Sequence, residues 1–153
     1  MLYPKVPLSR TTAMEAVGCT LLRRFGCALE MPSQICVASS TKDDERSSFS
    51  NYGKDMVHVF APGSNIVSTT PNGKYSSYSG TSMASPQVAG LAALIRSMQS
   101  MTGVETKKWI LDNVQVKSKY ADFVSTSGLI DVYGTINALG NISYKIHYKQ
   151  QLI

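Results

Sequence analysis

The stretch over residues 82–101 constrains the fold more than any other part of the sequence. Apolar side chains recur there at the three- and four-residue spacing of one helix face, and small side chains occupy the other faces. No charged residue occurs in it before Arg96, so we expect a long helix that is buried nearly all round. The apolar positions are Val88, Leu91, Ala92, Ile95 and Met98, and the small ones are Ala84, Ala89, Gly90 and Ala93.

The segments around this helix are predicted to form shorter elements. Residues 35–38 and 56–61 are apolar runs of the buried-strand type, and residues 66–70 and 74–78 flank Pro71-Asn72-Gly73, which predicts a β-hairpin. After the long helix, Gly103 fits a helix C-cap and residues 106–114 suggest an amphipathic helix. A further helix is expected from Asp131 to about Leu139, ended by Gly140. A short amphipathic helix over residues 12–29 is a weaker expectation because Gly18 and Gly26 interrupt it.

Composition excludes several classes of function. The net charge is +5, but the Lys and Arg residues are scattered apart from Arg23-Arg24 and the pair Lys145 and Lys149, so we predict no nucleic-acid binding. No apolar run reaches the roughly 18 to 20 residues of a membrane span, and we find no signal peptide. Cys19, Cys27 and Cys36 lack the spacing of a zinc or redox site, so buried or free thiols are expected.

The residues that carry chemistry lie where the long helix starts. Residues 80–90 read G-T-S-M-A-S-P-Q-V-A-G. A serine hydroxyl in the first turn of a helix lies near unpaired backbone N–H groups and the positive end of the dipole, which suits a developing oxyanion. Gly80 allows close approach of the backbone to a substrate, and Ala84 keeps the wall of the site low. The alternative is that Ser82 merely caps a buried helix.

This motif closely resembles the nucleophile motif of the subtilisin family of serine proteases, in which many members carry His at the position of Gln87. Five other segments resemble the family in the same order. Residues 35–41 are similar to its V-x-V-A-A-T, residues 49–53 to F-S-N-Y/F-G and residues 57–63 to V-D-V-x-A-P-G. Residues 66–69 match I-x-S-T, and residues 128–131 resemble G-x-I/V-D/N.

The resemblance implies a partial subtilisin-like α/β fold, with a parallel sheet covered by helices on both faces and a buried central helix that starts at the nucleophile. On this basis residues 34–140 are the C-terminal half of a peptidase domain. Residues 1–33 stay unassigned and are not expected to belong to it, and residues 141–153 form a peripheral tail. Such a chain is expected to be a fragment, or the product of an incomplete gene model whose first 33 residues are foreign to the domain, or to need an N-terminal half or a propeptide as partner.

The resemblance also implies a serine endopeptidase acting on polypeptide substrates. Ser82 takes the place of the nucleophile, its backbone N–H is half of the oxyanion hole, and Gly80, Thr81 and Met83 belong to the same oxyanion and nucleophile loop. The family places Asp, His and Asn before the serine, but residues 1–33 contain none of the three. Because a serine without a base is a weak nucleophile, we expect this chain alone to be inactive or nearly so.

Neither histidine replaces the family base. His58 is expected to be a hydrogen-bonded structural imidazole in a strand, and His147 to lie on the surface. No cofactor is visible in the sequence, although the resemblance implies that calcium can bind the full-length domain. A secretory or extracellular location is likewise implied only by the resemblance.

Two other functions stay open on the sequence alone. The first is a non-catalytic subtilisin-like protein that binds peptides, which the absent Asp and His favour. The second is an α/β-hydrolase esterase, because residues 80–84 almost match G-x-S-x-G, with Ala84 in place of the last glycine. The S-x-x-K match at residues 39–42 is attributed to chance, and the glycosylation sequon at Asn141 matters only in a secreted chain.

Overall fold

The structure, a computed structural model, describes residues 31–140. Several predictions therefore lie outside the described residues. They concern the helix over residues 12–29, the clusters of Arg and Lys, Cys19 and Cys27, His147, the sequon at Asn141 and the tail over residues 141–153.

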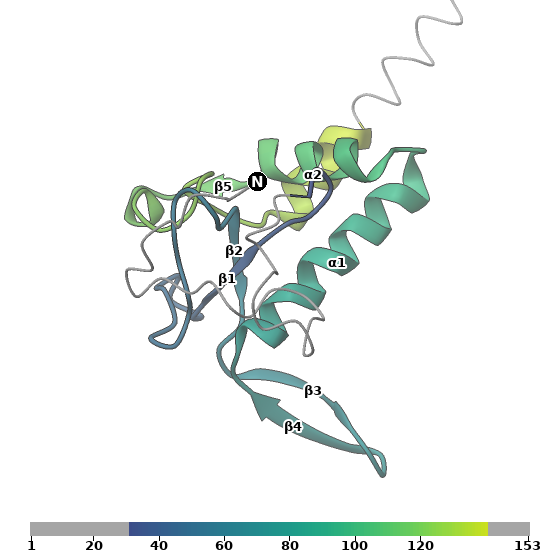
Figure 1. The fold of residues 1–153 in the computed structure, drawn as a ribbon. Coiled ribbons are helices and arrows are strands. Elements are labelled where there is room, and N and C mark those ends of the chain that lie inside the picture. Colours follow the sequence, from purple (N-terminus) through teal and green to yellow (C-terminus); the bar gives the residue numbers. More distant parts are fainter. Residues whose placement is uncertain (1–30, 141–153) are drawn as a thin grey trace, which may run out of the picture.

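A four-stranded, mostly parallel sheet forms the centre of the described part of the chain (Figure 1). Its strands are β1 (Val37–Ser40), β2 (Val59–Pro62), β5 (Gln115–Val116) and β6 (Gly128–Leu129), in the order β1-β2-β6-β5. The pairs β1–β2 and β2–β6 are parallel, with Val37 opposite Val59, whereas β5 and β6 are antiparallel. Both parallel strands predicted from apolar runs are present, and the α/β class is confirmed.

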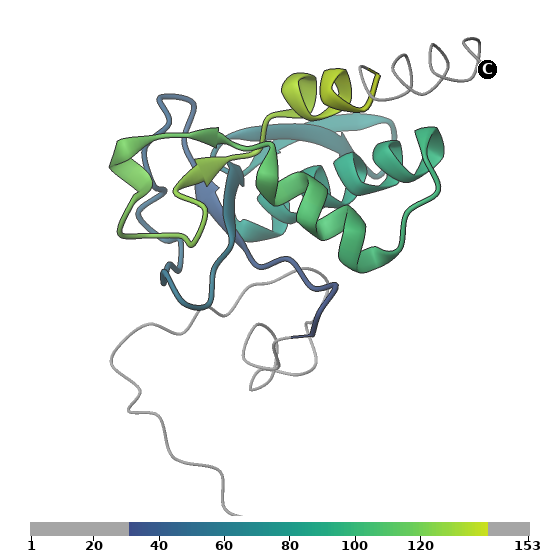
Figure 2. The same ribbon diagram turned by 90° about the horizontal axis from the view of Figure 1, so that it is seen from above.

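The helices gather on one face of this sheet. They are α1 (Thr81–Met98), α2 (Gly103–Asp112) and the helical residues 132–140, and all three contribute to one core cluster with Val37 and Val59 (Figure 2). The other face is covered by the 3-10 helix η2 (Ser118–Tyr120) and the segment that follows it, from which Tyr120 and Val124 pack on Phe60. Residues 31–140 thus show a mostly parallel sheet with its α-helices on one face, which is part of the architecture that the resemblance implies for the complete domain.

Helix α1 is buried on one side only. Ala84, Val88, Leu91 and Ile95 face the sheet and are buried, because side chains at this spacing share one face. The small residues of the opposite face, among them Ala89, Gly90 and Ala93, are exposed, as is Met98. The prediction of a helix buried nearly all round is thus wrong here, because the described residues supply a packing partner for only one face.

Helix α2 begins earlier than predicted. Gly103 is its first residue and not the C-cap of the preceding helix, which ends at Met98. Thr102 is the N-cap: its Oγ1 accepts a hydrogen bond of 3.2 Å from the Glu105 N–H, while Glu105 Oε2 accepts one of 2.7 Å from the Thr102 N–H. This is a capping box, a signal of the form T-x-x-E that is present in the sequence and fixes the start of the helix.

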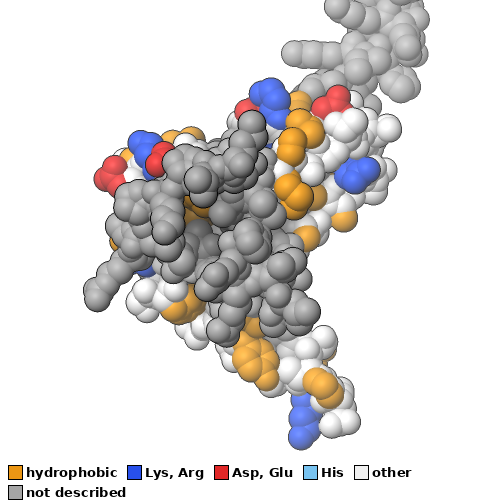
Figure 3. Space-filling view, viewed as in Figure 1, with side chains coloured by type: hydrophobic (Ala, Val, Ile, Leu, Met, Phe, Trp, Pro, Cys, Tyr) orange, Lys and Arg blue, Asp and Glu red, His pale blue; other side chains and the backbone are white. Residues whose placement is uncertain are grey.

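The predicted hairpin is present with the predicted bounds. Strands β3 (Ile66–Thr70) and β4 (Lys74–Tyr78) are antiparallel, and Asn72 and Gly73 both adopt positive φ, as the tight turn of an Asn-Gly hairpin requires. The hairpin projects as an arm from the body of the molecule, with apolar side chains exposed along it (Figures 1 and 3). Strand β4 leads directly to the start of α1.

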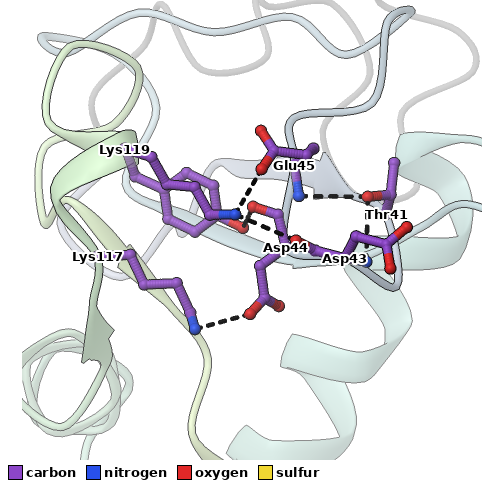
Figure 4. A network of polar contacts seen from close by, with 7 residues as sticks. Thr41, Asp43, Asp44, Glu45, Lys117 and Lys119 are labelled. Atoms are coloured by element: carbon purple, nitrogen blue, oxygen red, sulfur yellow. Dashed lines mark hydrogen bonds and ion pairs between the residues drawn. The ribbon is translucent and has the colours of Figure 1, made fainter.

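A polar network fixes the loop over residues 41–46, which follows β1 (Figure 4). Lys117 Nζ lies 2.7 Å from Asp44 Oδ2, and Lys119 Nζ lies 2.6 Å from Glu45 Oε1. Tyr120 donates its hydroxyl to the Asp44 carbonyl at 2.7 Å. The contacts link η2 to a loop more than seventy residues away in the sequence.

Within residues 31–140, no helix is long and apolar enough to cross a membrane, and no group of three His, Cys, Asp or Glu side chains could hold a metal ion.

Candidate active site

Ser82 is the second residue of α1 and its side chain is exposed. Gly80 is the N-cap, and the cap has no side-chain hydrogen bond. The Ser82 hydroxyl has no hydrogen-bond partner among the described residues, so it does not cap the helix. The structure therefore gives no support to the capping alternative, and the hydroxyl is left accessible at the end of the helix.

The backbone N–H groups of the first helical turn can bind an anion. The N–H groups of Met83 and Ala84 both donate to the Gly80 carbonyl, at 3.0 and 3.4 Å. The N–H of Ser82 precedes them in the turn, where helix geometry provides no intrahelical acceptor. An exposed hydroxyl, a nearby backbone donor and the positive end of the helix dipole thus coincide at one residue.

Gly63 connects the sheet to the start of α1. Its carbonyl accepts a 2.7 Å hydrogen bond from the Gly80 N–H, and its own N–H donates to the Ser40 carbonyl at 3.0 Å. A Cβ at Gly63 would collide with Ser39 Oγ and lie 2.7 Å from the Gly80 oxygen. The glycine is therefore required by this close approach of three backbone segments, and it holds the loop before Ser82 against the ends of β1 and β2.

Gln87 provides a second link between α1 and the sheet. Its Nε2 donates to the carbonyl of Pro62 at 2.7 Å and to that of Met83 at 3.3 Å. The side chain thus joins the first turns of the helix to the carboxyl end of β2. Sequence reasoning recorded Gln87 only as a departure from the family motif and missed this role, because the acceptor is a backbone atom that no sequence pattern marks.

The residues next to Ser82 in the motif differ in how far they are buried. Ala84 is fully buried in the core, so the expectation that it shapes the wall of the site is wrong; its small size serves packing between α1 and the sheet. Thr81 is also buried, and Met83 is half-buried. A Cβ on Gly80 would meet only Met83 Sδ and the Ser82 nitrogen, at 3.6 and 3.7 Å, so packing among the described residues does not require a glycine there.

His58 lies at the opposite end of β2 from the site. Its Nδ1 accepts a hydrogen bond of 2.9 Å from the Cys36 N–H, and its pKa is lowered by partial burial and then by the positive charge of Lys107. The expectation of a structural, hydrogen-bonded imidazole is confirmed. Cys36 is buried and disulfide-bonded, so the expectation of a free thiol is wrong at this position.

The fold and the site define an α/β domain in which a helix with an exposed serine in its first turn starts beside the carboxyl end of a parallel strand. The profile of the subtilase family matches residues 22–134, and the chain belongs to that family. This assignment overturns the α/β-hydrolase alternative.

Relatives of known name agree with the assignment. Subtilisin-like protease 1 of Trichophyton rubrum is 56% identical over 72 residues, which are 47% of this chain and 14% of the relative. Subtilisin-like protease 1 of Arthroderma otae is 60% identical over 70 residues, which are 45% of this chain and 14% of the relative. The chain thus spans about a seventh of the length of these two relatives.

Solved structures show the same partial coverage. A cold adapted subtilisin-like serine proteinase is 38% identical with a TM-score of 0.56, and the match covers 65% of this chain and 38% of that one. The structure of a subtilase cytotoxin SubAB assembly is 25% identical with a TM-score of 0.64, over 72% of this chain and 38% of that one. The described residues therefore match part of the subtilisin fold.

Proposed function

We propose that this chain supplies the nucleophile segment of a subtilisin-like serine endopeptidase, with Ser82 as the nucleophile and polypeptides as substrates. In this proposal the Ser82 N–H is half of the oxyanion hole, and Gly80, Thr81 and Met83 shape the loop around it. The observation that carries the proposal is the position of Ser82. It is exposed, in the first turn of α1, without a hydrogen-bond partner among the described residues, in a chain of the subtilase family.

The general base is proposed to come from outside residues 1–153. His58 accepts the Cys36 N–H at Nδ1 and precedes β2, whereas the start of α1 lies beside the last residue of that strand, which supports a base other than His58. Without a base the serine hydroxyl stays protonated and reacts slowly. We therefore propose that the chain alone is inactive or nearly so, and that a segment carrying the Asp, His and Asn of the family completes the site.

The exposed face of α1 supports an N-terminal half as the partner. Pro86, Ala89, Gly90 and Ala93 lie on the same side of the helix as Ser82, and all are exposed. A Cβ on Gly90 would meet nothing within 4 Å. Small, uncharged side chains allow a second layer to approach the helix closely, and the matched solved chains extend well beyond the part that this chain covers.

Labelling with a fluorophosphonate tests the role of Ser82. The probe is applied to the chain alone and to a chain extended at its N-terminus with the Asp, His and Asn segments of a subtilase domain. We expect labelling of the extended chain only, its loss in Ser82→Ala and its retention in Ser97→Ala, an exposed serine farther along the same helix. A folded extended chain that resists the probe would refute catalysis, and peptide binding by that chain would instead support the non-catalytic alternative.

The proposed packing on α1 has a separate test. Gly90→Leu fills the open space beside the helix, and because glycine is a poor helix former we expect the isolated chain to keep or gain helix stability. In the extended chain the added side chain should block docking and abolish labelling, whereas Gln99→Leu, beyond the end of α1, should not. Full labelling of Gly90→Leu would contradict the proposed interface.

A secretory or extracellular location is proposed on two grounds. The resemblance to the family implies it, and the disulfide at Cys36 is of the kind that persists in oxidising compartments. Reaction of the non-reduced protein with a maleimide, compared before and after reduction, tests the disulfide. Calcium in the full-length domain is likewise a proposal from the family resemblance.

A further inference from the structure

Two hydrogen bonds join Cys36 and His58 just before the parallel ladder of β1 and β2 begins. The Cys36 N–H donates to His58 Nδ1 at 2.9 Å, and the His58 backbone N–H donates to the Cys36 carbonyl at 2.9 Å. In the first hydrogen bond the acceptor is a side-chain nitrogen, whereas in a regular parallel ladder it would be a backbone carbonyl oxygen. The titratable side chain of His58 therefore holds Cys36 in place one residue before the first regular ladder pair, Val37 and Val59.

The direction of this hydrogen bond fixes the state of the imidazole. A ring nitrogen accepts a hydrogen bond only when it carries a lone pair, so Nδ1 is unprotonated and the single ring proton is on Nε2. An imidazolium has two donors and no acceptor. Protonation of Nδ1 would therefore place a donor against the Cys36 N–H, which belongs to a buried residue and would lose its partner.

The surroundings of the ring disfavour its charged form. The imidazole is partly buried, and Lys107 of α2 is the charged group that acts on it within residues 31–140. On the β1 side Cys36 is disulfide-bonded and does not titrate. On the remaining side Ser125 and Thr126 contribute hydroxyl groups, both of which contact the His58 carbonyl. The pKa of His58 is accordingly lowered, first by desolvation and then by Lys107.

We propose that His58 is an acid-sensitive latch that holds the start of β1 closed while its imidazole is neutral and releases it on protonation. The opening is local. Phe60 and Ala61, farther along β2, are fully buried and pair with Ala38 and Ser39 in the regular ladder. The part that opens is the backbone at Cys36, directly before β1. Acid therefore weakens the attachment of this disulfide-bonded residue to the sheet. The inference does not depend on the role of Ser82.

Amide hydrogen exchange of the complete 153-residue chain tests the latch. The protection factor of the Cys36 amide, corrected for intrinsic exchange, is compared between pH 7.5 and pH 5. We expect it to fall roughly two- to tenfold, the range that corresponds to loss of one net hydrogen bond. In His58→Asn the side-chain oxygen can replace Nδ1 as acceptor but does not titrate, so protection should stay constant. His147→Asn removes the other histidine and should behave as wild type.

Nitrogen chemical shifts of the imidazole provide a readout that does not require a variant to fold. At pH 7.5 His58 should show an unprotonated Nδ1 and a protonated Nε2, and the fall in Cys36 protection should follow the protonation of Nδ1. A ring protonated on Nδ1 at pH 7.5, or the same pH-dependent loss of protection in folded His58→Asn, would overturn the proposal.

Discussion

Gln87 Nε2 donates a 2.7 Å hydrogen bond to the carbonyl oxygen of Pro62, which joins α1 to the carboxyl end of β2 across 25 residues of sequence. This contact and the Gly80–Gly63 backbone hydrogen bond hold the helix start, and with it Ser82, against the sheet. The accessible serine is therefore supported by Gly63, which is buried, and by Gln87, which is half-buried.

Replacement of Gln87 by an apolar residue should destabilise this junction. Gln87→Leu removes the donor and leaves the Pro62 carbonyl without this partner, so we expect a loss of about 1–2 kcal/mol in the free energy of unfolding. Gln87→His retains an N–H donor and should lose less. Urea unfolding measures both, and Gln99→Leu, just beyond the end of the same helix, serves as control. Equal stability of Gln87→Leu and the control would show that the hydrogen bond contributes nothing.

Gly63→Ala should be more damaging than an alanine elsewhere. Its Cβ has no room between Ser39 and the Gly80 carbonyl, and overpacking of this kind costs about 1–3 kcal/mol. Gly53→Ala is the matched control, because a Cβ there would meet nothing within 4 Å. Thermal unfolding of both variants distinguishes the sites. Similar midpoints for the two would mean that the backbone segments around Gly63 can separate without cost.

The capping box makes Thr102 important for α2. Thr102→Ala removes the acceptor of the Glu105 N–H, and loss of such a cap costs about 1 kcal/mol. Ser100→Ala, at an exposed position just before the cap, should have little effect on the same unfolding curve. In the wild type the pKa of Glu105 is lowered, chiefly by the Thr102 backbone hydrogen bond and then by the side-chain one. The contribution of ionised Glu105 to the free energy of unfolding is therefore complete above the pKa of this carboxyl in the unfolded chain. It is lost as the pH falls through the lower pKa of the folded protein.

Lys107 should tune the pH dependence at His58. Because the folded pKa of His58 is lowered, the unfolded chain binds a proton first, and stability falls as pH decreases from about 6.5 toward the folded value. Lys107→Gln removes a positive charge, so the pKa of His58 should rise and the loss of stability should become smaller. Titration of the His58 ring by NMR measures the shift. Lys108→Gln is the control, because Lys108 is exposed and paired with Asp112, and it should leave the pKa of His58 unchanged.

Local signals predicted the elements that depend on neighbours in the sequence. The Asn-Gly turn specified the hairpin to its last residue, because two successive residues with positive φ match the twist of the strands. The apolar runs located β1 and β2 within a few residues. The start of α2 differs from the prediction, because the reciprocal hydrogen bonds of Thr102 and Glu105 begin the helix at Gly103.

Long-range contacts could not be predicted in the same way. The burial of Ala84, the exposure of Ala89 and Ala93 and the disulfide at Cys36 depend on what packs against each residue. Periodicity identified one face of α1 as apolar but could not show that the described residues cover only that face. For the same reason the motif pointed to Ser82 without revealing that Gln87 and Gly63 position it.

By itself the sequence determined the subtilase family, the α/β class and the serine at the start of a helix, because a motif and its local periodicity are written in consecutive residues. Only the tertiary structure decided that Ser82 is accessible and that His58 accepts a hydrogen bond from Cys36. Those properties are set by atoms that chain folding brings together from distant positions, and hydrogen bonding and burial depend on that proximity in space and not on order along the chain.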